Sequence, residues 1–199
     1  MNLFTAGDPG DGNTPLSPEE QNDLIPDLTT REELNEWERQ NILEAYAWGF
    51  DPRNLRRQDP LTEAYLRELH RRMFDQTWKW AGLYRSSEKN LGIAHYLIRD
   101  SLAALLGDAR YWLQHKTFLQ DEIAIRFHHR LVWIHPFPNG NGRHARIMAD
   151  VLIQAQGSHA FTWGGGDMAQ PGNFRSRYIH ALRAADHGDI GPILKFARS

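Results

Sequence analysis

The residues best suited to chemistry lie in one twelve-residue segment, 135–146, which reads HPFPNGNGRHAR. His135 opens the segment, and an imidazole can act as a general base near neutral pH. Gly140 and Gly142 allow the backbone to approach a ligand closely. The N–H groups of Gly140, Asn141 and Gly142 are expected at the N-terminus of a following helix. There the helix dipole and unpaired donors favour an anion.

Two cationic side chains follow this loop. Arg143 and Arg146 are three residues apart and therefore share one helix face. Guanidinium forks beside exposed N–H groups suit a polyphosphate. Phe137 is expected to pack inward and to anchor the loop. The competing interpretation is a tight turn with a buried histidine and two surface arginines, but so many suitable features within one short segment favour function.

The segment resembles the signature of the Fic family, His-Pro-Phe-x-(Asp/Glu)-Gly-Asn-(Gly/Lys)-Arg-x-x-Arg. The matching positions are His135, Pro136, Phe137, Gly140, Asn141, Gly142, Arg143 and Arg146. A wider pattern is similar to the Fic subgroup called mobile mystery protein B. It comprises Pro15 and Leu16, the stretch LTTREELNEWERQNILEA, and FTWGGGD.

The resemblance implies a protein adenylyltransferase that uses ATP and Mg²⁺. His135 would take the proton from a Ser, Thr or Tyr hydroxyl of a target protein. The hydroxyl oxygen would attack the α-phosphate of ATP, and pyrophosphate would leave. Residues 140–146 would bind the phosphates, with Arg143 and Arg146 at the β/γ end. The implied partners are a target protein, a small helix-turn-helix regulatory protein and, through self-AMPylation, the chain itself.

One position departs from the family signature. Asn139 stands where the family has the acidic residue that holds Mg²⁺. Mg²⁺ prefers carboxylate and phosphate oxygens, and Asn139, the candidate metal ligand here, offers only a neutral oxygen. Two alternatives therefore stay open: a nucleotide-binding, weakly active or inactive module that acts through a partner, and a transferase that uses another phosphate-bearing donor.

The periodicity of apolar residues predicts a mostly α fold. The resemblance makes this a Fic fold, a helical bundle with a central helix–loop–helix active site and a small β-hairpin flap that aligns the target. We expect a flexible lead-in over 1–28 and a single domain over 29–199, including an N-terminal helix at about 30–48 that Thr30 and Glu33 cap. Further helices are expected near Pro60, after a cap at Asp100 or Ser101, from Asp121 to Ile134, from Gly142, around Tyr178, and over 190–197. The expected flap residues are Lys89, Asn90, Leu91 and Gly92.

Many Fic proteins carry an inhibitory helix whose glutamate pairs with the second motif arginine, here Arg146. The acidic helix at about 30–48 lies at a suitable place in the chain, although its sequence lacks a clean inhibitory motif. Glu38 and Glu33 are the candidates, with Glu38 preferred because Trp37 would anchor the helix while Glu38 projects elsewhere. The competing interpretation is an exposed glutamate on a packed helix.

Composition narrows the remaining choices. The 199-residue chain has no cysteine, which excludes disulfides and thiolate metal sites. We find no signal peptide and no long apolar run, and expect a cytoplasmic protein without membrane or direct nucleic-acid contacts. Residues 1–40 carry ten acidic residues and two arginines, so an acidic front could dock on the basic remainder. His128, His129 and His135 are not expected to form a zinc site, and His144 is expected to face solvent.

Overall fold

The computed structural model describes residues 14–165 and 173–199, and within them the fold is almost entirely helical. The helices are α1 (Pro18–Gln21), α2 (Arg31–Gly49), α3 (Pro52–Arg57), α4 (Glu63–Phe74), α5 (Ile98–His115), α6 (Gln120–Ile134), α7 (Asn141–Ala155), α8 (Asn173–Asp186) and α9 (Gly191–Ala197). Two short 3₁₀ turns, η2 (His95–Leu97) and η3 (Trp163–Gly165), complete the regular structure of these residues.

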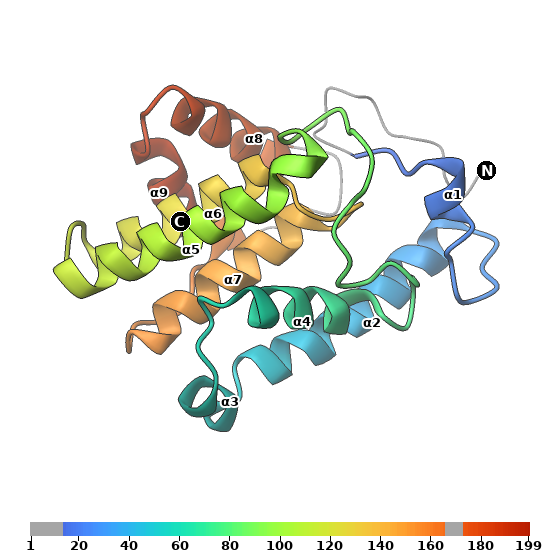
Figure 1. Cartoon of the computed structure of the whole chain (residues 1–199), viewed down its shortest axis with the longest axis horizontal. Helices are drawn as coiled ribbons and strands as arrows, with labels where there is room; N and C mark the ends of the chain where they lie inside the picture. Colours follow the sequence, from blue (N-terminus) through green and yellow to red (C-terminus); the bar gives the residue numbers. More distant parts are fainter. Residues whose placement is uncertain (1–13, 166–172) are drawn as a thin grey trace.

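Helices α6 and α7 form a central hairpin around which the other elements are arranged (Figure 1). Helix α4 packs against α7 on one side and carries α2 on its outer face. Helices α5 and α9 pack against α6, and α8 packs on α9. The loop between α6 and α7 therefore opens at one end of the bundle, held by elements on both sides.

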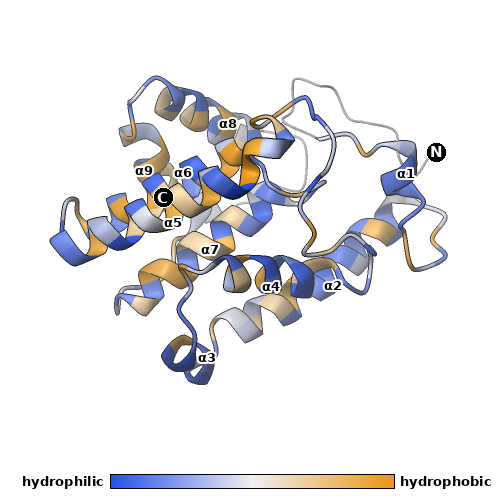
Figure 2. Ribbon diagram, in the orientation of Figure 1, coloured by the Kyte–Doolittle hydropathy of each residue, from blue (hydrophilic) through white to orange (hydrophobic). Residues whose placement is uncertain are grey.

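The core follows the apolar periodicity of the helices. Leu66, Leu69, Met73, Phe127 and Leu131 are all almost completely buried. Figure 2 shows hydrophobic and hydrophilic residues interspersed along α4, α5 and α7, as expected for helices with one buried face. Burial of these apolar faces stabilises the bundle and fixes the ends of α6 and α7 where the loop begins and ends.

The helix boundaries confirm several sequence predictions. Thr30 caps α2 in a complete capping box with Glu33, and α6 and α9 begin within one residue of the predicted positions. Helix α5 begins earlier than expected, at Ile98, so neither Asp100 nor Ser101 is its cap. Helix α2 ends at Gly49, just before Asp51 and Pro52. Asp51 then caps α3 by accepting from the Arg53 N–H, and Pro52 occupies the first turn of that helix.

Two side-chain orientations were predicted wrongly. His144 does not face solvent: it is fully buried and its Nε2 donates to the Leu66 carbonyl. On α2, Trp37 is 44% exposed, whereas Glu38 is only 8% exposed. Trp37 was expected to anchor the helix and Glu38 to project away from it, but the glutamate is the buried residue of the two.

The N-terminal segment has a defined place in the structure from residue 14 onwards. Ser17 and Glu20 form a capping box at α1, and Leu24 pairs with Trp78 in an isolated antiparallel bridge. The segment thus runs along the surface beside the α4–α5 connection. Residues 1–13 lie outside the described residues, and the flexibility of 1–28 stays a prediction.

Candidate active site

The loop between α6 and α7 is held in shape by its own residues. Helix α6 ends at Ile134 and is capped by His135, which adopts the left-handed conformation with φ 55°. Gly140 precedes α7 with φ 77°. The Asn141 side chain closes the loop, because its Oδ1 accepts from the Phe137 N–H at 2.9 Å and its Nδ2 donates to the Phe137 carbonyl at 2.8 Å. The loop is therefore held by hydrogen bonds between its own residues.

Phe137 forms the floor of this loop, packed on a histidine from α4. Phe137 is fully buried, and its ring stacks on His70 with centroids 3.6 Å apart. His70 Nδ1 accepts from the Gly82 N–H at 3.0 Å, so the ring proton lies on Nε2, which donates to the Asn139 carbonyl at 3.1 Å. Burial holds the pKa of His70 well below 6.5 and keeps it in this neutral form.

His135 stands at the entrance of the loop and is also largely buried. Burial, together with the positive charges of Arg85 and Lys89, lowers the pKa of His135 to about 4, while a hydrogen bond to the Val132 backbone opposes this fall. At neutral pH the ring is therefore uncharged, with one nitrogen free to accept a proton. Its Nε2 lies 2.8 Å from the Thr14 hydroxyl oxygen. A base in this state already has a hydroxyl within reach.

The first turn of α7 presents unpaired backbone donors where the sequence predicts an anion-binding end. Asn141, Gly142 and Arg143 are its first three residues, and their N–H groups have no acceptor within the helix. The Gly140 N–H does not join them, because it donates to Asn139 Oδ1 at 2.6 Å. The set of donors is thus shifted by one residue from the sequence prediction.

The two motif arginines, which were expected on one helix face, contact different neighbours of this turn. Arg146 lies over the Tyr178 ring of α8, 5.3 Å from its centroid. Its Nη1 is 3.8 Å from where a Cβ on Gly142 would stand, so this guanidinium lies beside the start of α7. Arg143 points toward α2 and α4, with its guanidinium 4.9 Å from the Phe74 centroid.

Glu38 of α2 reaches into this end of the site. Its Oε2 accepts from Arg143 Nη1 at 2.6 Å, and its Oε1 accepts from the Trp78 indole at 2.8 Å. The glutamate thus contacts the first motif arginine, whereas the resemblance implied the second, Arg146. Glu33, the other candidate, is exposed, and its carboxylate accepts from the Thr29 and Thr30 N–H groups.

The expected flap contains no strand and so is not a hairpin; it is an irregular loop over 83–94. One buried side chain joins the two halves of this loop, whereas backbone hydrogen bonds would join the strands of a hairpin. Arg85 donates to the carbonyls of Ser87 and Ile93, and its Nε donates to the His135 carbonyl at 2.7 Å. At the tip, a Cβ on Gly92 would lie 2.5 Å from His135 Cβ, so only glycine permits this close approach.

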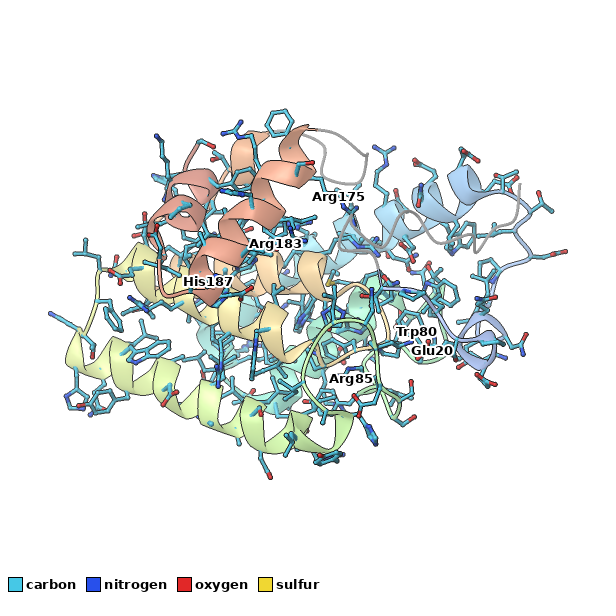
Figure 3. All side chains as sticks on the ribbon, turned by 90° about the horizontal axis from the view of Figure 1, so that it is seen from above. Glu20, Trp80, Arg85, Arg175, Arg183 and His187 are labelled. Atoms are coloured by element: carbon cyan, nitrogen blue, oxygen red, sulfur yellow. The ribbon has the colours of Figure 1, made fainter. Side chains whose placement is uncertain are left out.

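The flap also contacts the N-terminal segment. Lys89 Nζ donates to the Pro15 carbonyl at 3.2 Å and forms an ion pair with Glu20. Figure 3 shows Glu20 and Trp80 side by side, and the Trp80 indole donates to the Glu20 carbonyl at 3.2 Å. Residues 14–20 therefore contact both the flap and the loop that carries His135.

The side chains of the loop do not form a metal site by themselves. Asn139 Oδ1 already accepts from the Gly140 N–H, and Asn139 Nδ2 donates to the Thr14 carbonyl at 3.0 Å. In the part of the chain that the structure describes, no three His, Cys, Asp or Glu residues are grouped to hold an ion. A magnesium site made by protein ligands does not fit these residues, and we derive no step through one.

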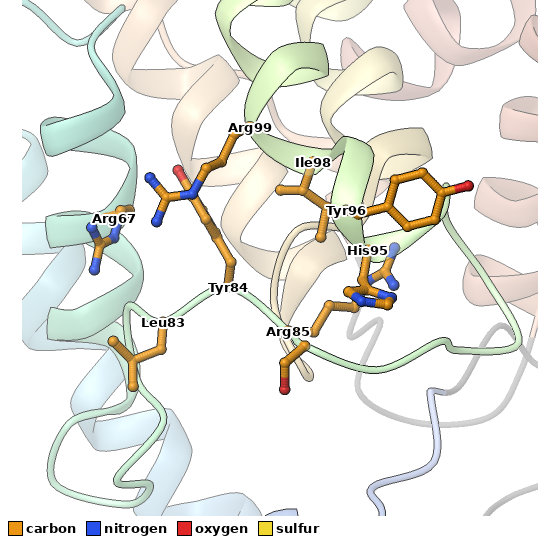
Figure 4. Close-up of a pocket in the computed structure, with 9 residues that line it drawn as sticks. Arg67, Leu83, Tyr84, Arg85, His95, Tyr96, Ile98 and Arg99 are labelled. Carbon is orange, nitrogen blue, oxygen red and sulfur yellow. The ribbon is translucent and has the colours of Figure 1, made fainter.

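A separate pocket of about 380 Å³ lies on the other side of the flap (Figure 4). Arg67 and Arg99 both lie over the Tyr84 ring there, at 5.5 and 5.8 Å from its centroid. Neither His135 nor the first turn of α7 lines this pocket, so it is distinct from the loop site.

Sequence reasoning located the loop but missed the residues that hold it. His70, Arg85 and Thr14 contact it from elements 69, 50 and 121 positions away in the chain. The sequence offered one signal, because Arg85 comes shortly before the expected flap residues 89–92. Asn90 and Leu91 belong to the same irregular loop, and Leu91 is 40% exposed.

Known proteins are similar to this chain over the region that contains the loop. Residues 60–153 match the model of the Fic/DOC family. Over 133 residues the chain is 32% identical to proteins named protein adenylyltransferase Fic from Drosophila virilis and Drosophila melanogaster. That alignment covers 65% of this chain and 26% of each relative, so the chain spans about a quarter of their length.

Solved structures share the fold. The N-terminal Fic domain of a Bartonella quintana effector superposes with a TM-score of 0.68 at 20% identity, covering 90% of this chain and 91% of that one. BepC from Bartonella tribocorum, determined with bound AMPPNP, has a TM-score of 0.63 at 22% identity, with coverage of 92% and 97%.

No helix among the described residues is long and apolar enough to cross a membrane.

Proposed function

Since residues 60–153 match the model of the Fic/DOC family, we propose that this chain is a protein adenylyltransferase of that family. It would transfer AMP from ATP to a Ser, Thr or Tyr hydroxyl of a target protein. The relatives that carry the name protein adenylyltransferase support this reaction, and the loop geometry supports it independently.

The observation that carries the proposal is the position of His135. Its neutral imidazole lies at the C-terminus of α6, with Nε2 at 2.8 Å from a hydroxyl. The N–H groups of Asn141, Gly142 and Arg143 begin the next helix, only a few residues away. A base and an anion site at the two ends of one rigid loop suit attack of a hydroxyl on a phosphate.

The roles of the residues follow from this arrangement. His135 Nε2 takes the hydroxyl proton, and the resulting nucleophile attacks the α-phosphorus of ATP. The donors at the start of α7 bind phosphate oxygens, and Arg146 beside Gly142 neutralises charge as pyrophosphate leaves. Arg85 positions His135 by holding its carbonyl, while Phe137 and His70 support the loop from below.

A second function, nucleotide binding with little or no turnover, is favoured by two observations. The loop offers no carboxylate for a metal, and Arg143 is engaged by Glu38. In this case the domain would act through a partner, such as the small helix-turn-helix protein implied by the resemblance to the mobile mystery protein B subgroup. Another phosphate-bearing donor is the remaining alternative for the same loop.

Labelling separates these functions. The chain is incubated with Mg²⁺ and ATP labelled at the α-phosphate, alone and in cell lysate, beside His135→Ala. AMP transfer predicts label on protein that disappears in His135→Ala, with unlabelled ATP competing better than other nucleotides. Binding of ATP without any labelled protein supports the second function. Label that survives in His135→Ala contradicts the assigned base.

We also propose that Glu38 regulates the site. Its carboxylate pairs with Arg143 beside the first turn of α7, in a partly buried contact where the Glu38 side chain is only 10% exposed. The carboxylate therefore competes with phosphate for Arg143 and opposes an incoming anion by charge. The cost of desolvating both ions offsets much of the attraction, so the pair acts by competition more than by stability.

A further inference from the structure

The N-terminal segment occupies the place where an acceptor hydroxyl must lie. Thr14 Oγ1 lies 2.8 Å from His135 Nε2. The Thr14 carbonyl accepts from Asn139 Nδ2 at 3.0 Å. The side chain and the backbone of Thr14 thus both contact the loop between α6 and α7. A hydroxyl at hydrogen-bond distance from the base satisfies the geometric requirement for proton transfer.

The segment is anchored to the body on the C-terminal side of Thr14. Lys89 binds both the Pro15 carbonyl and the Glu20 carboxylate, and the Trp80 indole donates to the Glu20 carbonyl. Further along, the Ile25 N–H donates to the Thr77 carbonyl at 2.9 Å. These contacts hold the chain on the C-terminal side of Thr14 in place. They therefore raise the effective concentration of the Thr14 hydroxyl at His135.

Neighbouring hydroxyls are committed elsewhere. Ser17 Oγ accepts from the Glu20 N–H in the α1 capping box, and Thr29 Oγ1 donates to the Glu33 carboxylate. Among the described residues of the N-terminal segment, Thr14 is thus the hydroxyl that the fold directs to the base. The flap contact through Lys89 further fixes the approach of the backbone.

We propose that Thr14 is an acceptor of AMP within its own chain, an inference that rests on the proposed AMP transfer. The Thr14 hydroxyl proton passes to His135 Nε2. A bond forms between Thr14 Oγ1 and the α-phosphorus of ATP, the bond from that phosphorus to the bridging oxygen of the β-phosphate breaks, and pyrophosphate leaves. The product is a phosphodiester-linked AMP on Thr14.

The full chain is tested with α-labelled ATP and Mg²⁺, both as wild type and with Glu38→Gln to release Arg143. Intact mass and peptide mapping should show one AMP, on the peptide that contains Thr14. Thr14→Val should reduce this labelling to the level of His135→Ala. Thr14→Ser should restore it, and Ser17→Ala, a matched loss of a nearby hydroxyl, should retain it.

Transfer within one chain gives a labelling rate per molecule that does not change with protein concentration. A tagged His135→Ala chain mixed with wild type should stay unlabelled. AMP on other residues with equal labelling in Thr14→Val overturns the inference, as does label on the His135→Ala chain. Label on lysate proteins without label on Thr14 rejects this inference alone. No label on any protein with Glu38→Gln rejects the proposed transfer as well.

Discussion

Gly140 is the residue whose replacement should damage the loop most directly. Its φ is +77°, and a Cβ there would lie 2.5 Å from two ring atoms of Phe74. Gly140→Ala should therefore destabilise the protein by about 1–2 kcal/mol from backbone strain and by about 1–3 kcal/mol from overpacking. Urea denaturation measures the loss, and AMP transfer should fall in parallel.

Gly107 in α5 provides the matched control for this prediction. It is a helical glycine with no neighbouring heavy atom within 4 Å of an added Cβ. Gly107→Ala should stabilise the chain by about 0.5–1 kcal/mol, because alanine loses less backbone entropy in a helix. Equal effects of the two substitutions would contradict the assigned role of Gly140.

Asn139→Asp tests whether the missing carboxylate limits the reaction. The aspartate would supply the charged oxygen that Mg²⁺ prefers. If ATP-bound Mg²⁺ approaches this position, the substitution should lower the Mg²⁺ concentration needed for half-maximal transfer roughly tenfold, which corresponds to ~1.4 kcal/mol. Transfer is measured across a Mg²⁺ titration. An unchanged metal dependence would show that residue 139 does not contact the ion.

Single residues of the site differ in how readily the sequence reveals them. The sequence predicts the positions of His135, Gly140 and Arg146, because these depend only on the local geometry of a loop and the adjoining helix turn. His70 and Arg85 are not, because their contacts depend on how α4 and the flap pack on the loop. The shifted set of N–H donors has a local cause that the motif does not encode: Asn139 folds back on the Gly140 N–H.

At the scale of elements, α2 should control the site through Glu38. Glu38→Gln keeps an acceptor for the Trp78 indole but removes the charge that holds Arg143. AMP transfer should rise roughly tenfold if the ion pair costs ATP about 1.4 kcal/mol of binding. The rate of labelling by ATP and the ATP concentration for half-maximal labelling measure the effect.

Glu36→Gln is the control on the same helix. Glu36 is exposed and pairs with Arg39, one turn along α2. Its substitution should leave labelling unchanged, since exposed pairs contribute little. Activation by both substitutions would indicate a general loosening of α2, and activation by neither, with both variants folded, would reject inhibition by Glu38.

Helices were predicted well because an apolar stripe and a cap are local signals. Thr30 and Glu33 locate the start of α2 on sequence alone. The side chains of Trp37 and Glu38 could not be assigned, because the burial of Glu38 depends on Trp78 and Arg143, which are remote in the chain. The flap was wrongly expected to be a hairpin. Hydrogen bonds from the Arg85 side chain hold the two halves of the flap together, in place of the backbone hydrogen bonds of a strand pair.

For the whole molecule, the uneven charge of the sequence has a structural counterpart. Glu20 and Glu38 from the acidic front bind Lys89 and Arg143 of the remainder. Both contacts adjoin the loop site. The position of these contacts lies beyond sequence reasoning, because composition gives the sign of each part but not the place where they meet.

The whole molecule should also lose stability in mild acid. His70, His128, His135 and His144 are buried, and burial is the main cause that lowers the pKa of each. The pKa of His135 falls to about 4 and that of His144 to about 3. An unfolded histidine titrates near pH 6.5. Above that pH the four side chains are neutral in both states and contribute no pH dependence.

As the pH falls below 6.5, the unfolded chain binds protons that the folded chain refuses, so the folded state is disfavoured. Each buried histidine can contribute up to about 1.4 kcal/mol per pH unit. Asp150 acts in the opposite direction, since burial raises its pKa to about 6 and the folded state takes up a proton as the pH falls through that value. One carboxyl offsets only part of the effect of four imidazoles.

The free energy of unfolding from urea titrations should therefore be level between pH 7.5 and 7 and should decrease between pH 6.5 and 5. His144→Gln, which can still donate to the Leu66 carbonyl, should lower stability at pH 7.5 but make its decline with acid shallower by about one proton. His115→Gln, at an exposed position, should leave the decline unchanged. Stability that is constant from pH 7.5 to 5 would contradict the neutral, buried state of these histidines, and with it the uncharged His135 on which proton transfer depends.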